Sequence, residues 1–546
     1  MNEENYEWLS HLKGSIPDEA YGDRIDMYVM ALEGWKRGLD LTFINIQSKN
    51  RVRYKLSNKN REHTFSVTRG DKVSNEAVSI CIRKHLTKKY LEKSGIPVPK
   101  GDNFTEESTD EDIIKYSHKI GFPVVIKPTN GSRGKGVISN IQTPEELVES
   151  LQYLRRDLNY PDIIIEQYFP GEEFRLHVVD NNVVGIIKRI PANIVGDGIH
   201  TIEELIALKN KKRKKVPNLY ARLIQIDKEV LNHIKGAGYN KNSILEKEEQ
   251  LFLRKKSNLS AGGDSIDYTE VLTEEIKQIA IGASNAIPGL GQCGVDIIVN
   301  EKENTGVVIE VNSRAGAGAH LFPLKGKARD IPKAIIDYYF PETISKSDST
   351  KKSKVYFDFK SVLDILKSGK AEEVKVQRKP KNIVVKKYIL SGKDIDKKDE
   401  KWIYRKATGL KLNGFLENNP HGGSFIVIGG NTKRVAKFKS MLDSARRFKG
   451  LNIEDEKWNK PIEIGFNIKE ISPEDIKENV TEIENLRIDL QKEKQNVKQY
   501  QKNIEKITKQ VKKSEQAYND LLNSKTWRYT SPIRKMGKLI SRTKKR

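Results

Sequence analysis

Cysteine is scarce in this chain of 546 residues, which contains only Cys81 and Cys293. The two cysteines lie far apart in the sequence and form no CxxC pair. This usage excludes a disulfide framework and a cysteine-based zinc site, and it fits a reducing cytoplasm.

Long apolar runs are also missing. No run approaches the ~20 apolar residues that a membrane-spanning helix needs. The start of the chain, Met1 to Glu7, is acidic and lacks the basic-then-apolar order of a signal peptide. We therefore expect a soluble protein of several domains that is located in the cytoplasm.

Acidic residues are outnumbered by basic ones, with 74 Asp and Glu against 98 Lys and Arg, which gives a formal charge of +24. This surplus favours anionic partners such as nucleotides, nucleic acid, acidic polymers or an anionic lipid surface, without choosing among them. No aromatic platform of the RNA-binding kind is interleaved with the basic residues, so nucleic acid is not the expected partner.

The pattern of the sequence divides the chain into six segments. The order of strands and helices predicts an α/β or α+β unit up to about residue 342, and we expect an α+β fold class for the protein. The segments are an N-terminal α/β region (1–76), an α+β unit of catalytic size (77–342), a linker or docking extension rich in Lys and Ser (343–383), a compact second unit (384–470), a long helix (473–523) and a basic tail (526–546).

A glycine-rich segment lies within the catalytic-size unit, at residues 124–138, VVIKPTNGSRGKGVI. An apolar strand ends at Lys127, and a second strand begins after a loop with three glycines, Gly131, Gly134 and Gly136. No GKS or GKT follows, which excludes a P-loop. Such a hairpin can fold over a triphosphate with its N–H groups facing phosphate oxygens. Glycine hairpins also occur for turn geometry alone.

A second hairpin carries acidic side chains among valines and isoleucines. The predicted strands 294–300 and 306–312 are joined by a polar turn. Glu310 and Asn312 project from one face because they are two residues apart, and Asp296 on the partner strand can face the same pocket. Two carboxylates and an amide oxygen suit Mg²⁺. A solvated strand face is the alternative interpretation.

Together, these features resemble the ATP-grasp superfamily. Residues 77–342 are most similar to the ligase domains of cyanophycin synthetases and bifunctional glutathione synthetases. The order of Lys127, the glycine hairpin, the segment IEQYFPGEE (165–173) and the acidic hairpin carries the resemblance. Further similar stretches are LTKK (86–89), GIPVP (95–99), FRLHVV (174–179), VGDGIHT (195–201) and NLSAGGDSID (258–267).

The resemblance implies an ATP-dependent ligase that joins a carboxylate to an amine through an acyl phosphate. A separate segment, 521–534 (LLNSKTWRYTSPIR), looks like tails found on some bacterial cell-surface glycosyltransferases, and this likeness implies action on a cell-surface polymer or its precursor. The resemblance implies that Lys84, Lys127 and the glycine hairpin contact the ATP phosphates, that Glu166 binds the adenine and that Glu173 binds the ribose. It also implies that two Mg²⁺ are coordinated by Asp296, Glu310 and Asn312. Negative charge would be neutralised by Arg175, Arg189 and Arg314. The segment 313–320 departs from the cyanophycin synthetase pattern, so the substrate pocket is not implied.

The second unit resembles acylphosphatase, whose fold is a ferredoxin-like βαββαβ. The match is ATGLKLNGFLEN (407–418), which places Asn418 on that family's catalytic asparagine. The position of the phosphate-binding arginine is Glu400, and residues 394–399 replace the glycine-rich loop. A carboxylate there repels an acyl phosphate, so we expect no hydrolysis and a role in binding or spacing.

The long helix has a heptad pattern. Its a positions are all apolar: Ile476, Ile483, Leu490, Val497, Ile504, Val511 and Tyr518. Four of the seven d positions are apolar: Leu486, Tyr500, Ile507 and Leu521. This pattern predicts a coiled coil and a homo-oligomer of undefined strand number. A single helix packed on the protein's own surface is the alternative.

The tail, 526–546, carries eight Arg or Lys and no acid. Its interleaved aromatic and aliphatic residues predict a basic amphipathic helix that can contact anionic lipid at the inner face of the membrane. A solvated basic tail is the alternative. A second function class therefore stands beside the ligase: a non-catalytic, nucleotide-binding coiled-coil scaffold at an anionic membrane surface.

Overall fold

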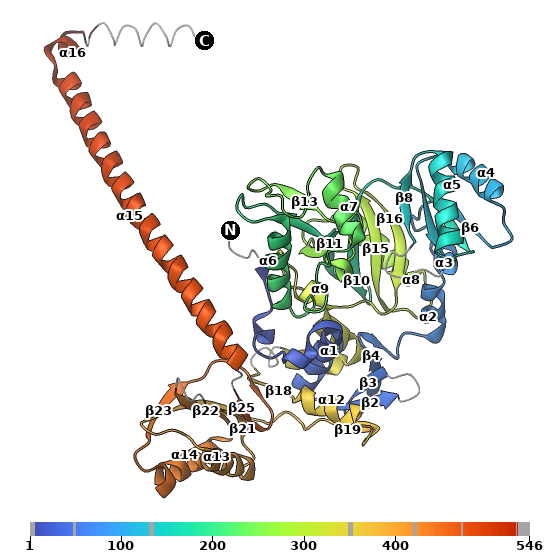
Figure 1. The fold of residues 1–546 in the computed structure, drawn as a ribbon. Helices are drawn as coiled ribbons and strands as arrows, with labels where there is room; N and C mark the ends of the chain where they lie inside the picture. Colours follow the sequence, from blue (N-terminus) through green and yellow to red (C-terminus); the bar gives the residue numbers. More distant parts are fainter. Residues whose placement is uncertain are drawn as a thin grey trace. The chain divides into compact units, whose positions relative to one another are not determined.

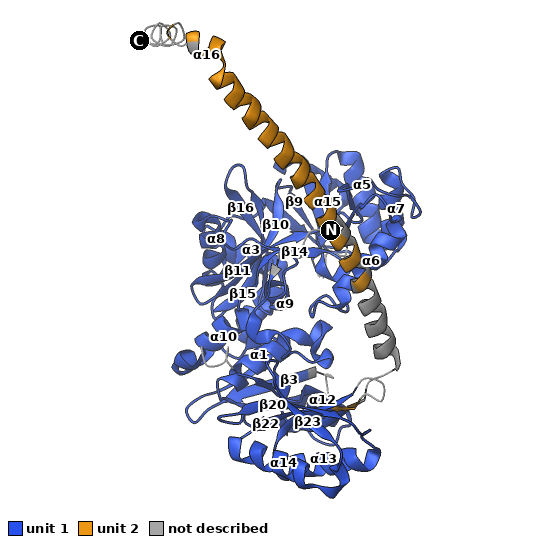
Figure 2. Cartoon of the chain, turned by 90° about the vertical axis from the view of Figure 1, so that its left-hand side faces the viewer, with its two compact units in different colours: residues 1–416, 423–468 blue, residues 417–422, 469–546 orange. Residues whose placement is uncertain are grey.

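The computed structural model describes residues 6–46, 51–129, 136–347, 353–418, 423–470, 473–530 and 532. The chain forms two compact units, Met1–Leu416 with Gly423–Ile468, and Glu417–Gly422 with Lys469–Arg546 (Figures 1 and 2). The first unit contains all the described sheets except the last residues of two strands.

The largest sheet of the catalytic-size unit is antiparallel and has five strands in the order β14-β11-β10-β15-β16. The strands are β10 (Glu172–Val179), β11 (Asn182–Ile190), β14 (Asp264–Asp267), β15 (Gln292–Asn300) and β16 (Thr305–Asn312). Alternate residues such as Phe174, Val295 and Ile297 pack with helix α8 (Glu274–Asn285) in one core cluster. Because successive side chains of a strand point to opposite faces of the sheet, the polar residues between these apolar ones lie on the other face.

A smaller four-stranded sheet lies beside the large one, with the order β6-β9-β7-β8. Its elements are β6 (Gly101–Phe104), α4 (Asp110–Ile120), β7 (Val124–Pro128), β8 (Ile138–Ile141), α5 (Pro144–Gln152) and β9 (Ile163–Gln167). The predicted strand–loop–strand hairpin is confirmed by the pairing of β7 with β8. Gly136 has φ of 73°, a left-handed conformation that favours glycine. Gly131 and Gly134 lie outside the described residues.

An insertion between β11 and β14 has its own small core. It contains β12 (Asn193–Val195), α6 (Ile202–Lys214), α7 (Lys228–Gly236) and β13 (Gln250–Phe252). Thr201 begins α6 with a capping box, since its hydroxyl accepts the N–H of Glu204 while the Glu204 carboxylate accepts the Thr201 N–H.

The N-terminal region folds together with residues that follow the catalytic-size unit. Helix α1 (Ile25–Lys36) is buried along its whole length. A five-stranded sheet has the order β19-β2-β3-β4-β5. Its strands are β2 (Asp40–Ile46), β3 (Arg51–Ser57), β4 (Glu62–Ser66), β5 (Arg69–Gly70) and β19 (Glu373–Lys375).

The segment predicted as a linker or docking extension, 343–383, packs against the N-terminal region. Its strand β19 pairs with β2, and its helix α12 (Phe359–Lys367) buries Phe359 and Leu363 in the same core as α1. It is a docked part of one fold and not a linker. The sequence left the choice between linker and docking extension open, because strand pairing across more than 300 residues leaves no local signal.

The second unit of the sequence has a βαββαβ order, with its last strand at 452–457 and not near 462–468, where the sequence pattern predicts it. It consists of β20 (Val384–Ser391), α13 (Lys397–Gly409), β21 (Asn413–Asn418), β22 (Ser424–Gly430), α14 (Thr432–Ser444) and β23 (Asn452–Lys457), with β25 (Phe466–Glu470) at the edge. The sheet order is β23-β20-β22-β21-β25. Helices α13 and α14 bury Ile403 and Phe438 against this sheet. The likeness to acylphosphatase in particular stays a prediction.

The second compact unit is dominated by helix α15 (Pro473–Asn523), which has 51 residues and is followed by α16 (Lys525–Tyr529). Five apolar a positions of the predicted heptads are between 50% and 63% exposed: Leu490, Val497, Ile504, Val511 and Tyr518. The coiled coil itself stays a prediction. Most of the basic tail, residues 531 and 533–546, lies outside the described residues. Within the described chain, every helix is too short or too polar to cross a membrane.

Candidate active site

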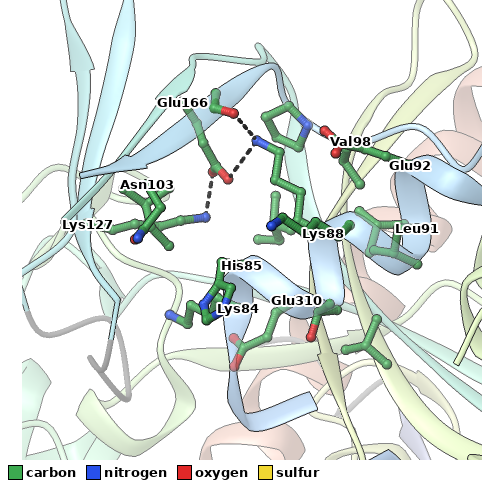
Figure 3. A pocket seen from close by; sticks show the side chains of 18 of the residues that line it. Lys84, His85, Lys88, Leu91, Glu92, Val98, Asn103, Lys127, Glu166 and Glu310 are labelled. Atoms are coloured by element: carbon green, nitrogen blue, oxygen red, sulfur yellow. Dashed lines mark hydrogen bonds and ion pairs between the residues drawn. The ribbon is translucent and has the colours of Figure 1, made fainter. Parts of the chain in front are cut away.

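A cavity of about 300 Å³ lies where the small sheet faces β16 (Figure 3). Helix α3 (Lys84–Lys93) supplies one side, and β6, β9 and β16 supply the others. Three of the residues that the resemblance assigns to ATP line it: Lys84, Lys127 and Glu166. Glu310, an assigned metal ligand, lines the same cavity. The structure thus brings together residues that are more than 220 positions apart in the sequence.

Glu166 is held between two lysines in this cavity (Figure 3). Its carboxylate accepts a hydrogen bond from Lys127 Nζ, and Lys88 Nζ lies 3.6 Å from the other oxygen. Lys88 also donates to the carbonyl oxygen of Gly101 at 3.1 Å. Because an ammonium group has three donors, Lys127 can keep its bond to Glu166 while it meets a phosphate. Sequence reasoning missed Lys88, although it lies one helical turn after Lys84.

The charge of Lys84 depends on its surroundings. Burial lowers the pKa of its ammonium group, and the nearby Glu310 carboxylate opposes that shift. Lys127 acts in the same direction as burial because it is a like charge. An anionic ligand in the cavity would therefore relieve the repulsion between the two lysines.

Asp296 occupies the centre of the polar face of the large sheet. Strand pairing places it directly opposite Arg175 on β10 and Glu310 on β16. Only 2% of Asp296 is exposed. Arg175 binds it in a bidentate manner, with Nε to Oδ1 and Nη2 to Oδ2 both at 2.6 Å. Arg189 Nη1 lies 3.2 Å from Oδ2.

These contacts decide the charge state of Asp296. Burial alone would raise the pKa of this carboxyl group, but the guanidinium groups of Arg175 and Arg189 hold it below its ordinary value. Asp296 is therefore an anion that retains unused lone pairs, since each carboxylate oxygen can accept more than one bond.

The other assigned residues differ in how they join this cluster. Glu173 accepts hydrogen bonds from Arg189 Nη1 and, at 2.6 Å, from Ser257 Oγ. Asn312 Nδ2 lies 3.5 Å from Asp296 Oδ2. Arg314 lies in the turn after β16 and is exposed, and no ion pair among the described residues joins it to the cluster. Its predicted role is the one that the geometry supports least.

The oxygen atoms of the three assigned metal ligands are of the type that binds a magnesium ion. Asp296, Glu310 and Asn312 stand on one face of two neighbouring strands, and Mg²⁺ prefers oxygen ligands and keeps water and phosphate in its shell. No cluster of three acidic, His or Cys side chains surrounds a single point among the described residues. An ion here would take only part of its shell from the protein.

Two buried histidines lie beside Arg175, and sequence reasoning missed both. The rings of His177 on β10 and His320 in the short helix α9 (Gly318–Leu321) are 5.5 Å apart in an edge-to-face contact. Burial, aided by the Arg175 charge, lowers the pKa of His177 to about 3. Burial also lowers the pKa of His320, so both imidazoles are neutral. Strand alternation could have revealed His177, which is two residues after Arg175.

The acylphosphatase-like unit contains carboxylates where the resemblance expects an arginine. Glu400 lies in the first turn of α13 with only 5% of it exposed, and Lys397 is 3.2 Å from its carboxylate. The neighbouring Asp399 accepts a hydrogen bond from Arg447 Nε at 2.7 Å. At the start of α13, Glu400 and Asp399 are therefore already paired with cations of the chain itself, Lys397 and Arg447.

Comparisons with known proteins match the part of the chain that contains the first of these sites. A family described as "ATP-grasp domain" matches residues 81–318. The glutathione biosynthesis bifunctional protein GshAB of Enterococcus faecalis is 35% identical over 271 residues, which cover 48% of this chain and 35% of that protein. Cyanophycin synthetase of Crocosphaera subtropica is 33% identical over 277 residues, which cover 48% of this chain and 31% of that protein.

A solved structure of a bifunctional glutathione synthetase from Pasteurella multocida aligns with a TM-score of 0.44 and 28% identity, over 55% of this chain and 42% of that one. The chain spans about a third of the length of these two curated relatives. Residues 81–318, which match the ATP-grasp domain family, contain all the assigned site residues.

Proposed function

We propose that the protein is an ATP-dependent carboxylate–amine ligase that forms an amide bond through an acyl phosphate. One observation carries this proposal. Asp296 and Glu310 face each other across two strands, Arg175 is bound to Asp296, and Glu310 lines the cavity that holds Lys84 and Lys127. Cations and carboxylates thus line one cavity, and the pair of Asp296 and Arg175 adjoins it at Glu310, an arrangement that phosphoryl transfer requires.

The proposed reaction has two steps. A carboxylate oxygen of the substrate attacks the γ-phosphorus of ATP, and ADP leaves. The amine then attacks the acyl carbon, phosphate leaves with that carboxylate oxygen, and the amine loses a proton. Lys84 and Lys127 would bind the phosphates, while Arg175 and Arg189 would stabilise charge on the transferring group.

Asp296, Glu310 and Asn312 would hold the expected two Mg²⁺, which neutralise charge on the β- and γ-phosphates. Glu166 and Glu173 are proposed to bind adenine and ribose. Both carboxylates are bonded to cations in the structure, Glu166 to Lys127 and Glu173 to Arg189. They are therefore fixed in place as hydrogen-bond acceptors before a nucleotide arrives.

The proposal is tested by trapping the intermediate. The full chain would be incubated with ATP, Mg²⁺, hydroxylamine and a panel of amino acids and uronic acids, and ADP and hydroxamate would be measured. We expect a hydroxamate with at least one carboxylate, because hydroxylamine intercepts acyl phosphates. ADP release without hydroxamate across the panel would contradict the ligase.

A second candidate function is the scaffold, in which the ATP-grasp domain binds nucleotide without ligation. The exposed apolar seam of α15 favours it, because eight large apolar side chains of this helix, from Leu490 to Leu521, are at least 50% exposed. Self-association through this seam would bury them. The tail would then contact anionic lipid. Light scattering of the full chain and of a variant that ends at residue 472 separates an oligomer from a monomer.

A further inference from the structure

The N-terminal region holds the loop that follows β16, which is called the metal-binding strand here because it carries the proposed metal ligands Glu310 and Asn312. This loop, Ser313–Gly318, begins directly after Asn312. On its inner side it leaves no free space, since a Cβ atom at Gly294 would lie 2.5 Å from Ala315 Cβ and 3.4 Å from Arg175 Cδ. Ala315 of the loop therefore packs against β15 at Gly294, and the Arg175 side chain passes beside the same glycine.

On its outer side the loop is bound by Asp26 of α1, which lies next to α9 (Figures 1 and 2). Asp26 Oδ1 accepts the backbone N–H groups of Ala317 at 2.8 Å and Gly318 at 2.7 Å. A Cβ at Gly316 would lie 2.7 Å from Asp26 Oδ2. The glycine thus permits the close approach of the carboxylate.

Two further residues of the N-terminal region bind the same loop. Thr68 Oγ1 donates to the carbonyl oxygen of Ala315 at 2.7 Å, and Arg69 Nη1 donates to Ser313 Oγ at 3.3 Å. Gln292 of β15 in turn donates to the carbonyl oxygen of Thr68 at 2.8 Å. Both ends of the loop are therefore fixed from outside residues 81–318.

The Asp26 carboxyl group is buried, with only 9% of the residue exposed. Burying a carboxylate is costly unless its bonds compensate. Burial raises the pKa of Asp26, and Arg222 and the two loop N–H groups oppose that shift. Among the described residues, the hydrogen bonds that the Asp26 side chain makes all go to this loop.

We propose that Asp26 is a positioning residue for the ligase, fixing the 313–318 loop so that the carboxylate substrate lies against Arg175 and the metal-binding strand. This inference rests on the proposed function. It makes the N-terminal region the support of a loop that forms one wall of the substrate site, and it predicts that ATP binding does not depend on this support. The loop is also where the sequence departs from cyanophycin synthetases.

The test compares Asp26→Ala, Asp26→Asn and Gly316→Ala with the unchanged full chain. Gly316→Ala displaces the same contact from the other side without removing a charge. Gly409→Ala is the matched control, because a Cβ there meets nothing within 4 Å. Hydrogen exchange of the 313–318 segment and the KM values for carboxylate and for ATP, in the hydroxamate assay, are the readouts.

We expect Asp26→Ala and Gly316→Ala to speed exchange of the loop and to raise the carboxylate KM by roughly 10- to 100-fold, as a small misplacement of substrate does. The KM for ATP should change less than about twofold. Asp26→Asn should lie between them and the wild type, because its amide oxygen can accept the same two N–H groups.

Unchanged loop exchange, or equal changes in both KM values, would overturn the positioning role while leaving the ligase intact. If the wild type forms no hydroxamate at all, the ligase assignment fails instead, and loop exchange alone then decides whether Asp26 fixes the loop.

Discussion

Asp296 and Asp399 are similar in burial and in their partners, yet they lie in very different sites. Each is at most 2% exposed, and each is bound by two cations, Arg175 and Arg189 in the first case and Arg447 and Lys393 in the second. Asp296 has Glu310 and Asn312 beside it on a sheet face. Asp399 lies at the start of α13, where its own cations satisfy it.

The difference shows that burial and ion pairing do not by themselves mark a functional carboxylate. What distinguishes Asp296 is the second carboxylate opposite it and the cavity that this second carboxylate lines. Predictions that separate the two aspartates therefore test the assignment of the site.

The largest expected effect is on Glu310. Glu310→Gln should leave the fold intact and lower ADP formation by ~10²-fold or more, because it removes an anionic ligand of the proposed metal. Glu303→Gln, in the turn between β15 and β16, is the control and should retain activity. A Glu310→Gln protein with normal turnover would remove the metal assignment.

Asp399→Ala should separate stability from activity. It leaves Arg447 and Lys393 without their partner, and both are partly exposed and can reach water. We expect a loss of about 1–3 kcal/mol in the free energy of unfolding, measured with urea, and unchanged ADP formation. A strong loss of ADP formation in a folded protein would mean that the two aspartates are functionally linked.

The buried histidines predict acid sensitivity. The pKa of His177 is about 3 when folded and near 6.5 when unfolded, so the unfolded state binds more protons between these values. Stability should therefore fall as pH is lowered through this window, by at most ~1.4 kcal/mol per pH unit for this histidine. His177→Asn should flatten the profile of unfolding free energy against pH. An identical slope in the variant would show that His177 does not remain neutral.

The smallest expected effect concerns the acylphosphatase-like unit. The full chain should not hydrolyse benzoyl phosphate, and Glu400→Arg should restore little, because Asp399 remains beside it at the start of α13. Phosphate release assays decide this. Hydrolysis by the wild type at the rate of an ordinary acylphosphatase would show that the alignment at Glu400 is wrong.

The sequence predicted what depends on local pattern. Strand alternation placed Asp296, Glu310 and Asn312 on one hairpin face, and the βαββαβ order followed from turns and periodicity. Contacts between distant segments could not be predicted, such as the pairing of β19 with β2 or the bonds from Asp26 to Ala317 and Gly318. The exposure of Arg314 also depends on how a turn leaves its strand, which residue type does not determine.

Oxygen transfer tests the central claim most directly. The full chain would turn over with ATP, Mg²⁺, an amine and an active carboxylate labelled with ¹⁸O, and the released phosphate would be analysed by mass spectrometry. The ligase mechanism predicts one ¹⁸O atom in each phosphate, because the carboxylate oxygen stays bonded to phosphorus when the acyl phosphate is cleaved. Unlabelled phosphate released together with ADP would contradict the acyl phosphate and the assigned function.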